Sequence, residues 1–143
     1  MKKKLLCFFI SFLSLHLCAQ ETGDTIISNN PQNFKVIVSY FHITHRCQTC
    51  YSIEKQVRKT IFENFKNELD SGIVALQIIN CELPENQAIK EKYQAYGATL
   101  ALTSLKNNVE EIKDISNFAF SEISNPDIFR EELSKIIINY LKE

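Results

Sequence analysis

Two cysteines separated by two residues, Cys47 and Cys50, are the side chains of this sequence best suited to covalent chemistry. They stand in the stretch YFHITHRCQTCYSIEKQV, where an apolar run gives way to a helix-like pattern. A thiolate is both a nucleophile and a metal ligand, and this spacing lets two sulfur atoms meet. The pair could therefore form a reversible disulfide, part of a metal site or a structural staple. A staple that closes so short a loop adds little stability, which makes it the weakest of the three.

The elements on either side of the pair predict that Cys47 begins a helix. Residues 34–42, FKVIVSYFH, are rich in β-branched and aromatic residues with little alternation, which is typical of a strand buried on both faces. After the pair, apolar residues recur at three- and four-residue steps, and they are Ile53, Val57, Ile61, Phe62, Phe65 and Leu69. The pattern predicts one long amphipathic helix that ends near residues 71–72. The unpaired N–H groups and positive dipole end of this helix would stabilise Cys47 as a thiolate, while Cys50 would be shielded one turn further in.

The rest of the chain predicts an α/β domain with a mixed central sheet. Its expected elements are a strand at 73–81, a helix from Pro84 that Gly97 caps, hairpin strands at 99–105 and 109–115, and a last helix from Asn125-Pro126. The resulting order is β-α-β-α-β-β-α. A strand-helix-strand unit predicts a parallel pair, to which the hairpin adds antiparallel strands.

The first twenty residues have the layout of a secretory signal peptide, with three lysines, an apolar run and then small or polar residues. We expect residues 1–20 to be removed by cleavage after Ala19 or Gln20. Lipidation at Cys18 and an uncleaved anchor are the alternatives. The expected location is secreted or periplasmic, with no stable membrane insertion after cleavage.

Beyond the signal peptide we expect a flexible lead-in at 21–33, with room for a short edge strand at 25–27, and one domain at 34–143. The formal net charge is −1 and the basic residues are interspersed with acidic ones, which argues against a nucleic-acid partner. With only three glycines the chain has no glycine-rich phosphate loop, so no flavin or nicotinamide cofactor is expected. We expect a monomer whose partners are thiols or disulfides of proteins or small molecules.

Three residues just before the pair are candidates for a supporting role. Arg46 and His45 would favour the Cys47 thiolate by charge or hydrogen bonding, unless they are solvated loop residues. His42 ends the buried strand and is the candidate base for proton transfer. The alternative for His42 is a core histidine whose hydrogen bonds are satisfied by the backbone.

Cys81 follows the second strand and would share a sheet edge with Cys47 if the two strands are parallel. Because Cys7 and Cys18 lie in or beside the leader, the mature chain keeps an odd number of cysteines and cannot pair them all internally. Cys81 could resolve a disulfide, or join Cys47 and Cys50 around a soft ion such as zinc, Cu(I) or trivalent arsenic. A buried, inert cysteine is the plainer alternative.

The element order, with C-x-x-C where the first buried strand meets the first helix, resembles the thioredoxin fold over essentially the whole mature chain. The resemblance implies a three-layer domain and a thiol–disulfide oxidoreductase. Thioredoxins carry an acid six residues before the first cysteine, where this chain has Phe41. They also carry a cis-proline before a threonine-containing strand, where this chain has Ala98. A cis bond before alanine costs roughly 3 kcal/mol, so we expect a trans bond there.

A narrower pattern runs through two parts of the chain. Its residues are Tyr40, Phe41, His42, Thr44, Arg46, Cys47, Thr49 and Cys50, and downstream Asn80, Pro84, Glu85, Asn86, Gln87 and Tyr93. They are similar to small exported thioredoxin-like proteins of the "nitrophenyl compound nitroreductase subunit ArsF" family, whose pattern is close to YFHGTxRCxTC. Ile43 replaces a glycine of that pattern, and Asn80-Cys81-Glu82 stands where the family has Asn-x-Asp.

The leading hypothesis is an exported thiol–disulfide oxidoreductase in which Cys47 is the nucleophile and Cys50 resolves the mixed disulfide. The alternative is a metal- or metalloid-binding module that uses Cys47 and Cys50, with Cys81 or His45 as an optional further ligand. A closed tetrahedral zinc site usually draws on a second C-x-x-C, which this chain lacks.

Overall fold

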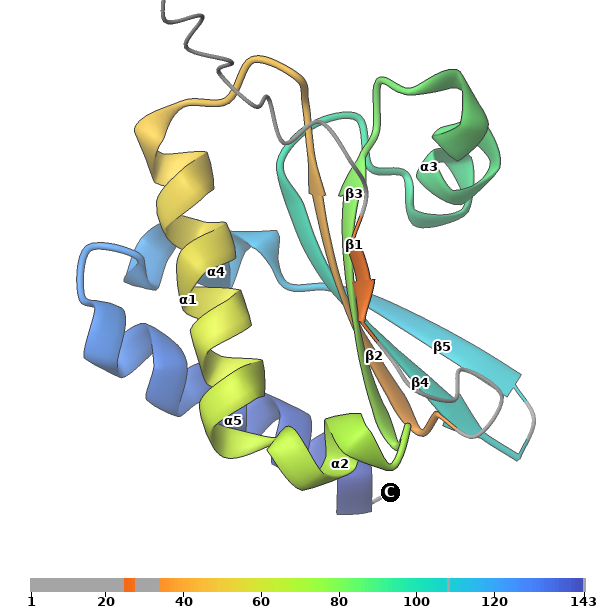
Figure 1. The fold of residues 1–143 in the computed structure, drawn as a ribbon, viewed down its shortest axis with the longest axis vertical. Helices are drawn as coiled ribbons and strands as arrows, with labels where there is room; N and C mark the ends of the chain where they lie inside the picture. The colour runs from red at the N-terminus through yellow and green to blue at the C-terminus, as the bar shows by residue number, and fades with distance from the viewer. Residues whose placement is uncertain (1–24, 28–33, 108, 143) are drawn as a thin grey trace, which may run out of the picture.

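The computed structural model describes residues 25–27, 34–107 and 109–142, which form a mixed sheet with helices on both faces (Figure 1). The sheet has five strands in the order β1-β3-β2-β4-β5. The strands are β1 (Thr25–Ile27), β2 (Val36–His42), β3 (Val74–Asn80), β4 (Thr99–Lys106) and β5 (Val109–Asp114). The predicted signal peptide at 1–20 lies outside the described residues, as does most of the predicted lead-in.

The central strand β2 is buried along its whole length, as its β-branched and aromatic residues with little alternation predict. It runs parallel to β3, with His42 beside Asn80, and antiparallel to β4, with Phe41 beside Thr99. The carboxyl ends of β2 and β3 therefore meet the start of β4 at one edge of the sheet. The segment that carries the two cysteines leaves the sheet at this edge.

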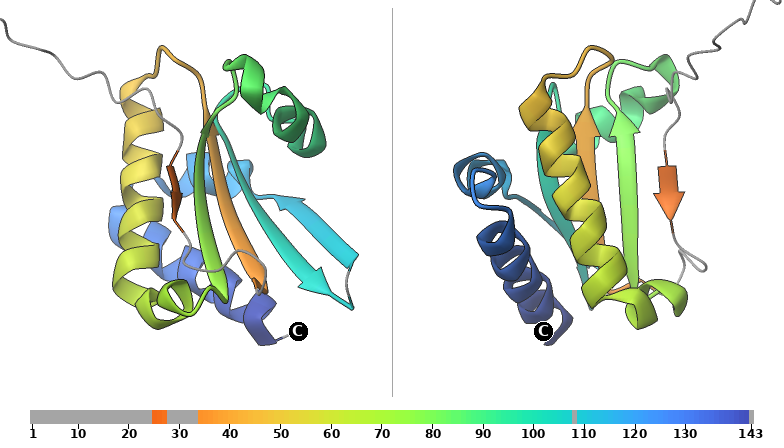
Figure 2. Two further views of the ribbon diagram at one scale, coloured as in Figure 1. Left: turned by 45° about the vertical axis from the view of Figure 1, so that its right-hand side comes forward. Right: turned by 60° about the vertical axis from the view of Figure 1, so that its left-hand side comes forward.

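Helices cover the two faces of the sheet unequally (Figures 1 and 2). They are α1 (Gln48–Asn64), α2 (Lys66–Asp70), α3 (Gln87–Tyr93), α4 (Ser116–Glu122) and α5 (Pro126–Lys142). Strand alternation points Tyr40 into the large core cluster with α1 and α5 residues, and Phe41 into a smaller cluster with Tyr93 of α3. The domain thus has three layers, with the larger core under α1.

The predicted order β-α-β-α-β-β-α and the mixed sheet are confirmed, and together they define a thioredoxin-like fold. Besides the divided first helix and the short turn at Pro84–Asn86, two further elements lie outside that predicted order. The edge strand β1, which the sequence left as an option, pairs antiparallel with β3. Helix α4 was not predicted; it begins where the Asp114 carboxylate accepts a hydrogen bond from the Ser116 N–H at 2.7 Å.

The helix after the cysteines is interrupted, so the prediction of one continuous helix was wrong. Phe65 has φ −129° and ψ 28°, which ends α1 and starts the short helix α2. The break allows Phe65 and Leu69 both to be buried in the large core cluster. The predicted end of the whole segment is correct, because Ser71 caps α2 and Gly72 has a positive φ of 77°.

The start and end of the third helix also differ from the prediction. Pro84 begins a 3-10 turn, Pro84–Asn86, and the α-helix follows from Gln87. Gln94, with φ 52° and ψ 36°, caps its C-terminus, so the prediction that Gly97 does so was wrong. The backbone N–H of Gln94 donates to the carbonyls of Glu91 and Lys90. These bonds hold Gln94 in the left-handed region.

Within the described part of the chain, no helix combines the length and apolar character needed to cross a bilayer.

Candidate active site

Cys47 is the N-cap residue of α1, with φ −83° and ψ 167°. Its sulfur accepts a hydrogen bond from the backbone N–H of Cys50 at 3.4 Å, one of the groups that the first turn of a helix leaves unpaired. The residue is exposed to solvent. The sequence-based expectation that Cys47 would stand at a helix N-terminus is therefore met, and its sulfur is open to attack a substrate.

Cys50 lies behind Cys47, in the first turn of α1, and is buried. Both residues are free thiols, and their sulfur atoms are 2.9 Å apart. A disulfide bond has a length of about 2.05 Å, so only a small movement of the side chains separates this arrangement from the oxidised pair. The geometry allows the two thiols to form a disulfide in place.

The two thiols differ in acidity. The hydrogen bond from the Cys50 thiol is the largest cause that lowers the pKa of Cys47, and the backbone N–H of Cys50 lowers it further. Burial is the largest cause that raises the pKa of Cys50, and the hydrogen bond it gives to Cys47 adds to this. At neutral pH the outer sulfur is therefore the more readily ionised one.

This difference predicts two separate pH profiles for alkylation. Because only the thiolate reacts, iodoacetamide should label Cys47 half-maximally below the pH of about 8.5 that is usual for a free cysteine, and Cys50 above it. Peptide mass spectrometry across a pH series measures both. Cys50→Ala removes the thiol donor and should raise the pKa of Cys47. One shared midpoint at the ordinary thiol pKa would contradict the assignment.

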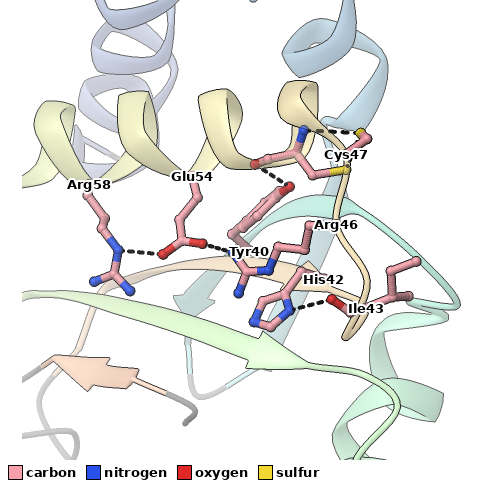
Figure 3. A network of polar contacts seen from close by, with 8 residues as sticks. Tyr40, His42, Ile43, Arg46, Cys47, Glu54 and Arg58 are labelled. Atoms are coloured by element: carbon pink, nitrogen blue, oxygen red, sulfur yellow. Dashed lines mark hydrogen bonds and ion pairs between the residues drawn. The ribbon is translucent and has the colours of Figure 1, made fainter. Parts of the chain in front are cut away.

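Tyr40 lies directly beneath the first turn of α1, and sequence reasoning did not single it out as a functional residue. Its side chain is fully buried, and its hydroxyl donates to the Cys50 carbonyl at 2.9 Å (Figure 3). Burial raises the pKa of Tyr40 above its usual range, so the hydroxyl keeps its proton. The available signal was strand alternation, which puts Tyr40 on the helix-facing side of β2.

His42, the predicted base, is buried, and its Nδ1 lies 3.0 Å from the Ile43 carbonyl oxygen. Its imidazole is directed away from the Cys47 side chain (Figure 3). The Tyr40 hydroxyl, by contrast, donates to the Cys50 carbonyl. The backbone contact favours the alternative of a core histidine. A role for His42 in proton transfer stays a prediction.

Arg46 is turned toward α1 and not toward the Cys47 sulfur. Its guanidinium forms an ion pair with Glu54 (Figure 3). It also lies 5.3 Å from the centre of the Tyr51 ring. Arg58 bonds the other Glu54 oxygen at 2.7 Å. Burial alone would raise the pKa of Glu54, yet the hydrogen bonds from Arg58 and Arg46 lower it overall. Arg46 thus fastens the loop before Cys47 to α1 through a carboxylate that stays ionised.

A second set of hydrogen bonds fastens the same loop to the end of β3. The Thr44 N–H donates to the Glu82 carboxylate at 2.9 Å, and the Asn80 amide donates to the Thr44 hydroxyl at 3.1 Å. Asn86 in turn donates to the Asn80 carbonyl at 2.9 Å. His45 is exposed on this loop, and its charge contributes to lowering the pKa of Glu82 after the larger effect of the Thr44 bond. The loop before Cys47 is therefore bound to α1 through Arg46 and to the end of β3 through Thr44.

Cys81 lies on the opposite side of the sheet from the Tyr40 cluster. It is buried with Phe41, Ile79 and Tyr93, and burial raises the pKa of its thiol. Its N–H donates to the His42 carbonyl at 2.8 Å. Among the described residues, no three His, Cys, Asp or Glu side chains are grouped so as to hold a metal ion. The structure therefore does not bring Cys81 into a three-sulfur site with the pair.

The loop before β4 contains Ala98, and the peptide bond preceding Ala98 is trans, as expected. This loop joins the sheet edge beside the cysteine segment, because Thr99 pairs with Phe41. Tyr96 in the same loop is 70% exposed. The site thus lacks the cis bond that thioredoxins place here, and it carries an exposed aromatic ring nearby in the chain.

No protein-family model matches this chain, and no curated protein matches it. Among solved structures, the chain is similar to the solution structure of a thioredoxin from Thermus thermophilus, with 17% sequence identity and a TM-score of 0.38. The match covers 63% of this chain and 72% of that one. The strand order and connections of this chain define its thioredoxin-like fold.

Proposed function

We propose that this protein is a thioredoxin-like thiol–disulfide oxidoreductase in which Cys47 attacks and Cys50 resolves. The observation that carries the proposal is the asymmetry of the pair. Cys47 is exposed at the start of α1 with a backbone N–H on its sulfur, and Cys50 is buried with its sulfur 2.9 Å away. A thiolate that is accessible beside a thiol that is protected suits the two successive steps of disulfide exchange.

In the first step the Cys47 thiolate attacks one sulfur of a substrate disulfide. An S–S bond forms between Cys47 and the substrate, and the other substrate sulfur leaves as a thiolate that takes up a proton. In the second step the Cys50 thiolate attacks the Cys47 sulfur, which forms the Cys47–Cys50 disulfide and releases the second substrate thiol. Two electrons pass from the pair to the substrate, and the reverse sequence oxidises a substrate dithiol.

The proposed setting is outside the cytoplasm, and it rests on the signal-peptide pattern of residues 1–20. In an oxidising compartment the pair acts as a reductant only if a donor supplies electrons, and otherwise as an oxidant or isomerising agent. The YFH, R-C-x-T-C and P-E-N-Q segments support a place within the ArsF-type group of small exported thioredoxin-like proteins. The partners proposed are proteins or small molecules that carry thiols or disulfides.

A redox titration of the purified protein tests this function. The protein is equilibrated with reduced and oxidised glutathione in varied ratio, thiols are labelled, and peptides are assigned by mass spectrometry. A single Cys47–Cys50 couple that equilibrates reversibly, with Cys81 labelled only after unfolding, is the expected result. Zinc or copper retained in stoichiometric amount with no exchange would favour the metal-binding alternative instead.

A further inference from the structure

The buried hydroxyl of Tyr40 is the polar group that reaches the resolving cysteine from the core side. Tyr40 belongs to β2 and lies two residues before the strand ends. Its ring is fully buried between the sheet and α1. A buried hydroxyl needs a hydrogen-bond partner, and this one donates to the Cys50 carbonyl at 2.9 Å (Figure 3). The phenol proton therefore lies against the backbone of Cys50, the residue whose sulfur must later become a nucleophile.

The same hydroxyl also affects the acidity of Cys50. Burial is the largest cause that raises the pKa of the Cys50 thiol and Cys47 adds to it, while the nearby Tyr40 hydroxyl lowers it. The charged groups that face the phenol are Arg46 on the loop and Glu54 on α1, and neither removes its proton, since burial keeps the pKa of Tyr40 high. Tyr40 is therefore a donor at this site and not a base.

We propose that Tyr40 is a catalytic residue of the resolving step, whose hydroxyl turns from the Cys50 carbonyl to the Cys50 sulfur and stabilises it as a thiolate. This inference rests on the proposed function. The proton of the Cys50 thiol passes through water to the substrate thiolate released in the reaction, and the phenol keeps its own proton throughout. A hydrogen bond to the ionised sulfur is stronger than one to the neutral carbonyl, which favours the turn.

This role explains how the site works without an acid at Phe41. An acid at that position would assist by accepting the Cys50 proton, whereas a phenol one residue earlier assists by holding the charge that remains. Strand alternation directs Phe41 into the opposite cluster, with Tyr93, and Tyr40 toward α1. The residue of β2 that reaches the resolving cysteine is thus Tyr40, which faces α1.

The first test measures the pKa of Cys50 by alkylation in a Cys47→Ala background. Tyr40→Phe should raise it by about one unit, the effect of losing one hydrogen bond to a thiolate. Tyr93→Phe is the matched control, because it also removes a buried hydroxyl, one that lies 2.5 Å from the Thr103 hydroxyl in the other half of the core. The control should leave the pKa of Cys50 unchanged.

The second test follows the decay of a preformed mixed disulfide on Cys47 by rapid quenching and mass spectrometry. A rise of one unit cuts the thiolate fraction about tenfold, but the more basic thiolate is about threefold more nucleophilic, so resolution should slow about threefold in Tyr40→Phe. Formation of the mixed disulfide, measured in a Cys50→Ser background, should keep its rate, because that step uses Cys47 alone.

The outcomes separate this inference from the proposed function. If the wild-type protein performs no exchange, the proposed function fails, while the alkylation profile still decides what Tyr40 does to Cys50. If exchange is normal and Tyr40→Phe leaves the Cys50 pKa in place, the role of Tyr40 is overturned. Should Tyr40→Phe not fold, 3,5-difluorotyrosine placed at position 40 keeps the ring shape and strengthens the donor, so it should lower the Cys50 pKa; no change there would equally overturn the role.

Discussion

Replacing Cys47 with serine should reduce thiol–disulfide exchange to the uncatalysed background, whereas Cys50→Ser should stop the reaction at a mixed disulfide on Cys47. The two results differ because a serine hydroxyl stays protonated near neutral pH and cannot begin the attack, while loss of Cys50 removes only the second step. Incubation with a peptide disulfide, followed by mass spectrometry of the intact protein and its peptides, measures both. The trapped adduct should be released by added dithiol reductant.

Cys81→Ser is the matched control for these variants. Cys81 is buried in the cluster under α3, apart from the pair, so its loss should leave exchange near the wild-type rate. Exchange that persists in Cys47→Ser, or an adduct recovered on Cys81, would show that the nucleophile has been assigned to the wrong residue. We expect Cys47 to be the attacking residue because it is the exposed one of the three cysteines in the described residues.

Phe129→Ala should lower the free energy of unfolding by about 3–5 kcal/mol, the range found when a fully buried phenylalanine is truncated. Phe129 has no exposed surface and lies in the large core cluster, with its ring 5.2 Å from that of Phe118 between centroids. The alanine leaves a cavity where α4 and α5 meet the core. With a typical urea dependence, the loss should move the denaturation midpoint down by about 2 M.

Ile128→Ala provides the comparison on the same helix. Ile128 is 43% exposed, so its truncation removes little buried contact and should change stability by about 0.5 kcal/mol or less. Equal losses for the two variants, measured by urea denaturation followed by circular dichroism, would mean that α5 is not packed as described.

The loop between β2 and α1 is fixed by two separate groups of polar contacts. On the helix side, Arg46 pairs with Glu54; on the strand side, Thr44 bonds Glu82 and Asn80. Both carboxylates have a lowered pKa, caused mainly by hydrogen bonds that outweigh burial, so both stay charged at neutral pH. The loop therefore presents Cys47 at a defined position without using the charge of Arg46 to activate it.

The sequence alone was enough to locate most of the strands and helices and to place the outer cysteine at a helix start. The β-branched and aromatic run of β2 and the three- and four-residue apolar steps of α1 are local patterns, and each reports which face of its element must be buried. Cys47 stands at the boundary between them, so its place at a helix N-terminus followed from neighbours within a few residues. The hairpin β4–β5 was predicted for the same reason, from two strand-like runs with a short polar turn between them.

The tertiary structure decided which side chains meet. Tyr40 touches Cys50 only because β2 packs beneath the first turn of α1, and Arg46 turns to Glu54 because that carboxylate lies within reach of the loop. The sequence predicted that Cys81 would lie at the same sheet edge as the cysteine pair, yet Cys81 is buried in the cluster with Phe41 and Tyr93. Local periodicity specifies a buried face, but contacts between separate elements depend on how those faces dock and which rotamers fit, and that information is spread over the whole chain.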